Sequence, residues 1–233
     1  MKKSILYTIC GVAVVAAIVA TLIFIFVSIN KKPDAEKPNL IGTWTVAAIY
    51  ENDKPIFTDK QYMVFSKDNA AMYKDGNSEP FASSSYSINK ANKLLLPDIS
   101  HKYKVDKKTD NCIRLYETAT KYMLLVRNST AAPAKTPVRV ADFEGKWNVI
   151  MKGDLLNSGE RFEFSKTSLK YYKADSNKPF AATTFYVTEG FIFNAQNLGL
   201  TMRCYPISSS DTFVLIEDSG TVWEIKKEQI GLF

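Results

Sequence analysis

Hydrophobic and polar residues alternate in short runs along most of the chain after residue 40. The segment Arg161-Phe162-Glu163-Phe164 alternates cleanly, which predicts a strand with both phenylalanines facing a core. Residues 43–50 alternate in the same way, so one face is expected to carry Trp44, Val46, Ala48 and Tyr50. Further strands are predicted at 69–74, 81–88, 93–96, 101–106, 111–117 and 120–127, and again at 168–173, 180–188, 190–194, 199–205, 211–217 and 221–227.

The strand pattern occurs twice, with the second copy about 100 residues after the first. Gly42-Thr43-Trp44 returns as Gly145-Lys146-Trp147, Phe65-Ser66-Lys67 as Phe164-Ser165-Lys166, and Pro80-Phe81-Ala82 as Pro179-Phe180-Ala181. A repeat of this length is a whole domain, because solenoid units span only about 20–50 residues. About eight short strands per copy, joined by brief turns, predict an all-β fold of two small up-and-down barrels.

The N-terminus differs from the rest, because residues 5–29 form an almost unbroken apolar run without charge. As a helix this run would be about 37 Å long, which exceeds a hydrocarbon core of about 30 Å. It is also longer than the apolar part of a cleaved signal peptide. We therefore expect one uncleaved transmembrane helix at 1–30, with the N-terminus in the cytosol and the barrels outside it.

These patterns predict the domain boundaries. After the anchor at 1–30 come a tether at 31–37, the first barrel at 38–127, a linker at 128–140, the second barrel at 141–227 and a tail at 228–233. The linker contains Ala-Ala-Pro-Ala-Lys-Thr-Pro and has no periodicity. The two barrels are accordingly expected to share few contacts and to unfold separately.

Composition argues against several classes of chemistry. The 233 residues carry a net charge of +6, but the lysines are scattered rather than arranged in a basic stripe, so no nucleic-acid partner is expected. His101 is the single histidine, and the sequence contains no Cys-x-x-Cys, carboxylate ligand cluster or glycine-rich phosphate loop. We therefore expect no enzyme, no catalytic residue, no metal site and no cofactor. Whether Cys112 and Cys204 pair is left open.

The Gly-x-Trp at the start of each copy resembles the first-strand motif of the lipocalin family, in its small bacterial lipocalin-like form. This resemblance covers about 38–127 and 141–227. It implies that Trp44 and Trp147 close one end of each barrel, that Gly42 and Gly145 allow close backbone approach, and that Arg127 and Lys227 pack across the tryptophans. It also implies an interior that holds a small hydrophobic molecule, although copies of only about 90 residues leave little room.

Two functions remain open at this point. In the first, the protein is tethered to the membrane by residues 5–29 and binds a small hydrophobic ligand or lipid at the bacterial cell envelope. The aligned aromatic and small polar residues of the two copies are the candidate ligand contacts: Tyr73, Ser85, Tyr86, Tyr172, Thr184 and Phe185. In the second, filled barrels form an interaction or scaffold module for an envelope protein partner. The first function predicts an open cavity, and the second predicts packed cores with exposed apolar surface.

Overall fold

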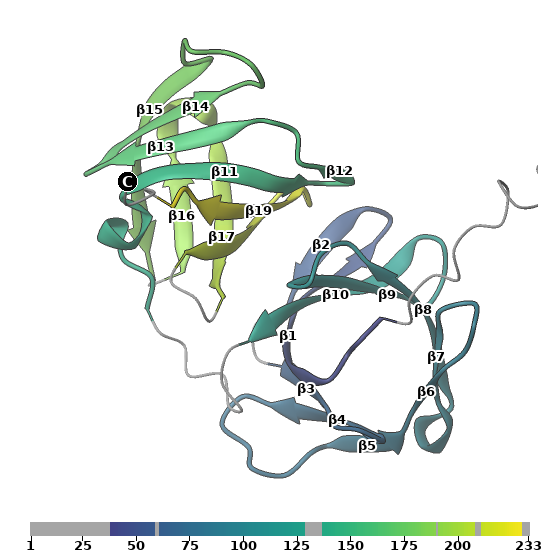
Figure 1. Ribbon diagram of the computed structural model, residues 1–233. Coiled ribbons are helices and arrows are strands. Elements are labelled where there is room, and N and C mark those ends of the chain that lie inside the picture. Colours follow the sequence, from purple (N-terminus) through teal and green to yellow (C-terminus); the bar gives the residue numbers. More distant parts are fainter. Residues whose placement is uncertain (1–37, 59–60, 129–136, 190, 208–210, 230–233) are drawn as a thin grey trace, which may run out of the picture. The chain divides into compact units, whose positions relative to one another are not determined.

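The computed structural model describes residues 38–58, 61–128, 137–189, 191–207 and 211–229, and these form two antiparallel barrels in tandem (Figure 1). The predicted anchor at 1–30 and the tether at 31–37 lie outside the described residues. In the described part of the chain, no helix is long and apolar enough to cross a bilayer.

The first barrel is built from strands that follow one another around the ring. They are β1 (Gly42–Glu51), β2 (Lys54–Phe57), β3 (Gln61–Phe65), β4 (Asn69–Lys74), β5 (Ala82–Ser85), β6 (Ser87–Ile88), β7 (Lys93–Leu96), β8 (His101–Lys107), β9 (Cys112–Tyr116) and β10 (Lys121–Asn128), with the 3₁₀ turn η1 (Pro97–Ile99) before β8. The first strand pairs with both β3 and β10. Because β5 and β6 are consecutive parts of one bent strand, which pair with β4 and β7, the ring is closed or nearly closed.

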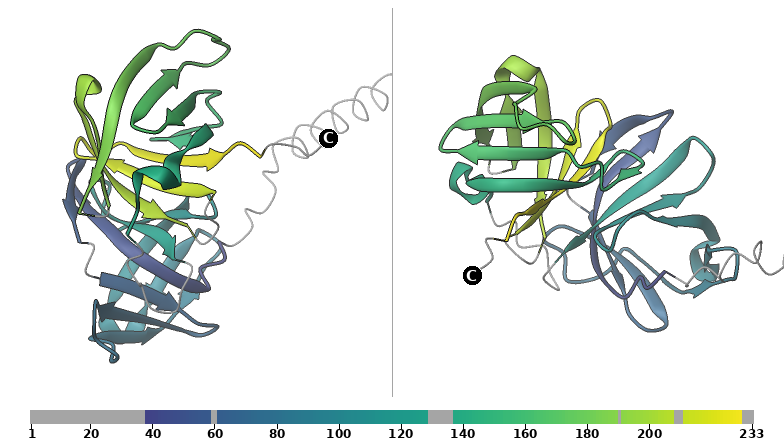
Figure 2. Two further views of the ribbon diagram at one scale, coloured as in Figure 1. Left: turned by 90° about the vertical axis from the view of Figure 1, so that its left-hand side faces the viewer. Right: turned by 45° about the horizontal axis from the view of Figure 1, so that its top comes forward.

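The second barrel repeats this plan (Figure 2). Its elements are η2 (Val140–Phe143), β11 (Gly145–Lys152), β12 (Leu155–Leu156), β13 (Arg161–Ser165), β14 (Ser168–Tyr172), β15 (Ala181–Thr188), β16 (Ile192–Ala195), η3 (Gln196–Leu198), β17 (Leu200–Pro206), β18 (Thr212–Glu217) and β19 (Val222–Lys227). Here β11 closes the ring by pairing with β19, and one continuous strand, β15, pairs with both β14 and β16. The predicted strands are thus confirmed, and the short hairpin strands β2 and β12 are additions that the pattern did not predict.

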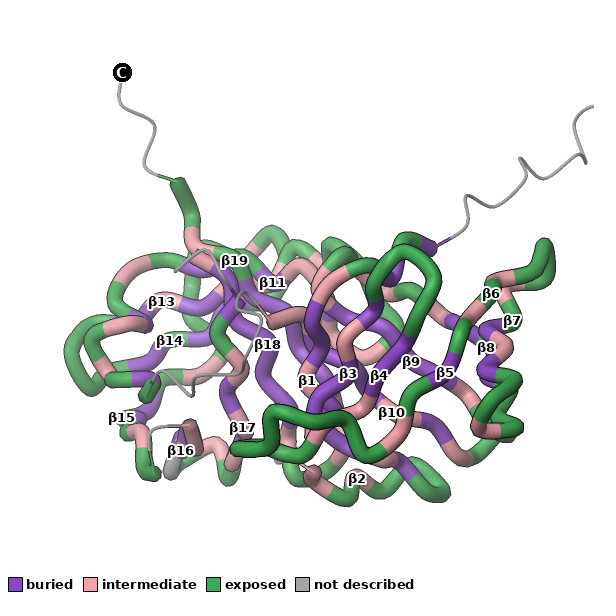
Figure 3. The backbone as a smooth tube through the Cα atoms, turned by 90° about the horizontal axis from the view of Figure 1, so that it is seen from below, coloured by how far each residue is buried: buried purple, intermediate pink, exposed green. Residues whose placement is uncertain are grey.

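Each barrel has its own packed interior, and buried residues lie along the strands while exposed residues concentrate in the turns (Figure 3). Phe162 and Phe164 face the second core, as the alternation predicted, and the aligned Met63 and Phe65 face the first. The second interior is rich in aromatic rings centred on Phe143, which is fully buried. These rings fill the barrel. Burying each large aromatic side chain removes about 150–250 Å² of its surface from water.

A β-bulge in the first strand of each barrel corrects one prediction. The pairing of β1 with β10 shifts between Val46 and Ala48, so Trp44 and Val46 point into the barrel, whereas Ala48 and Tyr50 belong to a different buried cluster. The expectation that all four share one face is therefore wrong. A bulge adds one residue to one strand, and this single insertion reverses the facing of every residue after it.

The bulge has a counterpart in the second barrel, between Val149 and Met151 of β11. Beyond the two bulges, the first strands and the last two strands of both barrels contribute to one shared apolar cluster. Its fully or nearly fully buried members are Ala47, Ala48, Tyr50, Cys112, Tyr122, Leu124, Val126, Met151, Ile207, Val214, Ile216 and Val222. Residues 38–233 consequently form one compact unit, and the expectation of two barrels with few shared contacts is wrong.

Polar contacts reinforce this shared cluster. Arg114, which is 7% exposed, donates to the Asp154 carboxylate at 2.6 Å and to the carbonyl of Gly153 at 3.3 Å. The Tyr50 hydroxyl donates to the carbonyl of Gly220 at 2.9 Å. These bonds run between the barrels, so they fix the register of the interface that the apolar cluster creates.

The two buried cysteines are both free thiols and lie in different clusters. Cys112 belongs to the shared cluster and Cys204 to the interior of the second barrel. Burial raises the pKa of both thiols, which keeps them protonated and unreactive at neutral pH. Both therefore act as small apolar residues, and the pairing that the sequence left open is not formed.

Candidate functional site

The tryptophan of each Gly-x-Trp segment lies buried in the interior of its barrel. The indole Nε1 of Trp44 donates to the carbonyl of Leu40 at 2.7 Å. The Arg127 guanidinium lies over the ring, with its carbon 4.3 Å from the ring centroid, as the resemblance implied. A cation in this position contributes about 0.5–2 kcal/mol.

The tryptophan of the second barrel is held in the same way. Trp147 is fully buried and donates to the carbonyl of Phe143 at 2.6 Å, while the Lys227 ammonium lies 5.6 Å from its ring centroid. A 3₁₀ turn, η2, directly precedes the Gly-x-Trp of this barrel. In the first barrel the described residues before Gly42 contain no regular 3₁₀ turn.

Gly42 has a left-handed φ of 131°, and a Cβ at this position would lie 2.9 Å from Arg127 Nη1. We predict that Gly42→Ala lowers the free energy of unfolding by about 1–3 kcal/mol, because it strains the backbone and displaces the stacked guanidinium. Chemical denaturation measures this loss. Gly76→Ala is the matched control, because Gly76 also has a positive φ, of 82°, but has open space around it. Equal losses in the two variants would contradict a role for the Arg127 contact.

The opposite end of the second barrel, at the far end of β11, holds an interlocked polar cluster. The Lys152 ammonium donates to Glu160 and to the Tyr171 hydroxyl, each at 3.2 Å, and lies 4.4 Å from the ring centroid of Trp223. The Tyr171 hydroxyl in turn donates to Glu160. Because Tyr171 and Trp223 belong to the interior cluster, these side chains fill the barrel mouth.

Electrostatics within this cluster favour a neutral Tyr171 phenol beside an ionised Glu160 carboxylate. Burial and the neighbouring Glu160 carboxylate both raise the pKa of Tyr171, which keeps the phenol protonated as a donor. Burial alone would raise the pKa of Glu160, but the hydrogen bonds from Tyr171 and Lys152 outweigh it and hold the pKa below its ordinary value. The cluster is therefore a satisfied ion pair at neutral pH.

The equivalent end of the first barrel carries mainly apolar side chains, with Gln61 where the second barrel has Glu160. Ile49 lies opposite Met123 on β10 and opposite Ile56 on β2, so these three side chains share one face of the sheet. Met123 and Met72 pack against the first interior and are only partly buried, and Ile56 is 53% exposed. The first barrel mouth, defined by Ile49, Ile56, Met72 and Met123, thus presents accessible aliphatic and thioether groups to solvent.

The candidate ligand contacts predicted from the sequence are not gathered in either interior. Tyr73 follows Met72 on β4, so it points outward, where it stacks on Tyr62 with ring centroids 4.8 Å apart. Tyr172 likewise points outward, and its hydroxyl donates to Glu163 at 2.8 Å. These two tyrosines therefore do not line a barrel interior.

The other four predicted contacts are divided between the two faces. Ser85 and Thr184 are exposed, and Ser85 donates to the Asp98 carboxylate through its backbone and hydroxyl groups. Phe185 is buried within the second interior, and Tyr86 packs at the edge of the first, with its ring 5.3 Å from that of Phe65. Only the last two face inward, and they do so as parts of packed cores.

Sequence reasoning missed the residues at the two mouths, although a signal was available. The two copies can be aligned position by position, and at the mouths they differ in chemistry. Lys152, Glu160, Tyr171 and Trp223 stand where the first copy has Ile49, Gln61, Met72 and Met123. At these four positions an aliphatic, thioether or amide side chain of the first copy is replaced by a charged or aromatic one in the second, and this change of chemistry was the available signal.

Comparisons with known proteins do not assign the chain to a family. No protein-family model matches it, and no curated protein does. A DUF3598-family protein of unknown function from Nostoc punctiforme is similar in structure, with 10% identity, a TM-score of 0.30 and coverage of 81% of this chain and 96% of that one. A putative DNA polymerase III β subunit from Eubacterium rectale has 7% identity and a TM-score of 0.14, with coverage of 81% of this chain and 58% of that one.

Proposed function

We propose that the protein is a non-enzymatic, lipocalin-like binding protein that holds the acyl chain of a lipid at the mouth of its first barrel. The observation that carries this proposal is the contrast between the mouths. Where the second barrel is filled by the Lys152–Glu160 pair and its aromatic neighbours, the first offers partly exposed Ile49, Met72 and Met123.

The chemistry of the first mouth suits a flexible apolar chain. Methionine side chains are unbranched and polarizable, so they adapt to ligands of varied shape. Phe81, which is 50% exposed, extends the apolar surface beside this mouth, since its backbone N–H donates to the carbonyl of Met72. Covering these groups with an acyl chain would contribute about 25 cal/mol for each Å² of apolar surface removed from water.

The second barrel is the less favourable host. An apolar chain entering its mouth would separate Lys152 from Glu160 and leave both charges without partners. Breaking such a pair costs about 3–5 kcal/mol, more than the burial of a few methylene groups returns. We assign the second barrel the role of a filled support that holds the first.

Two features support the lipocalin-like and membrane-bound parts of the proposal. Both copies stack a basic residue on the tryptophan of their Gly-x-Trp, which is the arrangement that the family resemblance implied. The apolar run at 5–29 has the length of a membrane anchor, so it would hold an extracytoplasmic first barrel close to a supply of lipid.

Binding of a dansyl-labelled fatty acid to residues 38–233 tests the proposal. We predict that Met72→Lys weakens binding at least about tenfold, because it places a charge among the apolar groups of the mouth. Tyr73→Lys is the matched control, because it adds the same side chain one position along β4 on the outer face. Fluorescence titration compares the two variants. Equal affinity in both, or no binding by the unaltered protein, would refute the proposal.

The alternative function is a scaffold or interaction module for an envelope protein, and the two packed interiors favour it. Phe81 and Phe180, at equivalent positions of the two copies, are 50% and 62% exposed and would serve as contacts. Native mass spectrometry of residues 38–233 separates the two functions. A co-purifying lipid supports ligand binding, whereas a protein free of small molecules that also fails the titration supports the scaffold.

A further inference from the structure

A polar hollow of about 520 Å³ lies where the two barrels meet, away from both mouths. The first barrel contributes the turn between β8 and β9, and the second contributes the bulged part of β11 together with β18 and β19. Its size suits a small molecule, because ligand sites commonly enclose about 300–1,000 Å³. Neither barrel alone could form this hollow.

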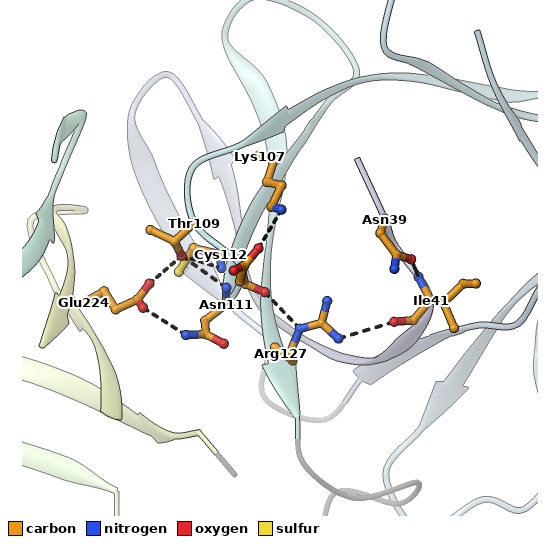
Figure 4. A network of polar contacts seen from close by, with 9 residues as sticks. Asn39, Ile41, Lys107, Thr109, Asn111, Cys112, Arg127 and Glu224 are labelled. Carbon is orange, nitrogen blue, oxygen red and sulfur yellow. Dashed lines mark hydrogen bonds and ion pairs between the residues drawn. The ribbon is translucent and has the colours of Figure 1, made fainter. Parts of the chain in front are cut away.

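Glu224 is a buried carboxylate of the hollow, with only 4% of the residue exposed. It accepts hydrogen bonds from the Thr109 hydroxyl and from Asn111 Nδ2, the latter at 2.9 Å (Figure 4). The Thr109 oxygen also accepts from the backbone N–H groups of Asn111 and Cys112, at 3.2 and 3.0 Å. These bonds hold the turn of the first barrel against β19 of the second and fix the side chains that line the hollow.

The same turn is anchored from the other side. The Arg127 guanidinium, which stacks on Trp44, donates through Nε to the carbonyl of Asp110 at 2.9 Å. The Asp110 carboxylate pairs with Lys107 at 2.6 Å, which holds the pKa of Asp110 below its ordinary value. The turn that contributes Thr109 and Asn111 to the hollow is therefore positioned before any ligand arrives, which lowers the ordering cost of binding.

The lining combines cations with hydrogen-bonding oxygens. Three lysines, Lys107, Lys108 and Lys226, face two carboxylates. Lys107 and Lys108 are engaged with Asp110 and with Asp106 and Asp154, respectively. Within the described residues, no ion pair is recorded for the exposed Lys226. This leaves one ammonium available to an incoming anion, beside carboxylate, hydroxyl and amide groups that suit ligand hydroxyls.

We propose that this hollow binds an anionic sugar, that is, a small polyhydroxylated molecule with one phosphate or carboxylate group. Lys226 binds the anionic group, since ammonium–oxyanion hydrogen bonds are stronger than neutral ones. The Asp110 carboxylate and the free lone pairs of Glu224 accept from the sugar hydroxyls. The site is separate from the first barrel mouth, so a failure of acyl-chain binding would not contradict this proposal.

Isothermal titration of residues 38–233 at constant ionic strength tests this site with four probes: glucose 6-phosphate, glucuronate, glucose and inorganic phosphate. We expect at least one of the two anionic sugars to bind about tenfold or more tightly than both glucose and phosphate. A preference for glucose 6-phosphate identifies the phosphate class, and a preference for glucuronate identifies the carboxylate class. Equal binding of all four probes, binding of phosphate alone, or no binding would overturn the proposal.

Variants locate the site. Lys226→Met should weaken the preferred sugar about tenfold, and Lys226→Arg should retain most of the affinity because it keeps the charge. Lys170→Met removes an equal charge from an exposed position on β14 and serves as the control. Thermal unfolding should be nearly unchanged in all three. If Lys170→Met weakens binding as much as Lys226→Met does, the effect is one of net charge and the hollow is not the site.

Discussion

Trp147→Ala is expected to shift the unfolding of the whole tandem as one transition. Removing a fully buried tryptophan typically costs about 3–5 kcal/mol, and here it also deprives the carbonyl of Phe143 of its donor. The cavity opens only in the second barrel. Because the shared apolar cluster and the Arg114–Asp154 pair join the two barrels, the first barrel should unfold together with the destabilised second one. Trp44→Ala should behave in the same way from the other side.

Differential scanning calorimetry measures this coupling. In both variants the calorimetric and van 't Hoff enthalpies should agree, as they do for a two-state transition. A first transition moved to lower temperature, followed by a second one at the original position, would show that the barrels are energetically independent.

Val214→Asp is expected to separate the two barrels while leaving each one folded. Val214 is fully buried in the shared cluster, and it points away from the second interior because its neighbours Phe213 and Leu215 point inward. An aspartate there would be buried without a partner and would lie directly across the sheet from Glu224. Burying an unpaired charge of this kind costs about 3–5 kcal/mol, and the cost is relieved if the interface opens.

This variant should therefore show two unfolding transitions in place of one, and calorimetry combined with tryptophan fluorescence would detect them. Val214→Ala is the control, since it removes two methyl groups without adding charge and should keep a single transition at a modestly lower temperature. A single transition in Val214→Asp would mean that the polar contacts alone suffice to couple the barrels.

Much of the fold was predictable from the sequence because the alternation in each copy supports that in the other. The strand from Arg161 to Phe164 alternates without ambiguity, and the aligned Met63 and Phe65 then take the same facing. The bulge could not be predicted, because Ala47 and Ala48 are both small and apolar and either fits a core. Its position became apparent only when the register with Leu124 and Leu125 was known.

The candidate site was less predictable. The position of Arg127 over Trp44 was anticipated only through the resemblance that the recurring Gly-x-Trp carries. Aligned positions such as Tyr73 and Tyr172 are also similar in both copies, yet similarity does not say whether a side chain points inward. The face of the sheet on which a side chain lies depends on strand register. The long-range contacts that build the hollow around Glu224 depend on how the two barrels pack together.

The matching bulges have a consequence for how such a molecule can arise. The same strands of both copies contribute buried residues to the shared cluster, namely β1, β9 and β10 in one and β11, β18 and β19 in the other. A single barrel with this bulge would present a self-complementary face, and an isologous interface requires only that the same patch meets itself. The covalent tandem thus needs only one patch, repeated in each copy, to build its interface. The mouths lie outside this patch and differ, because one is charged and the other is mainly apolar.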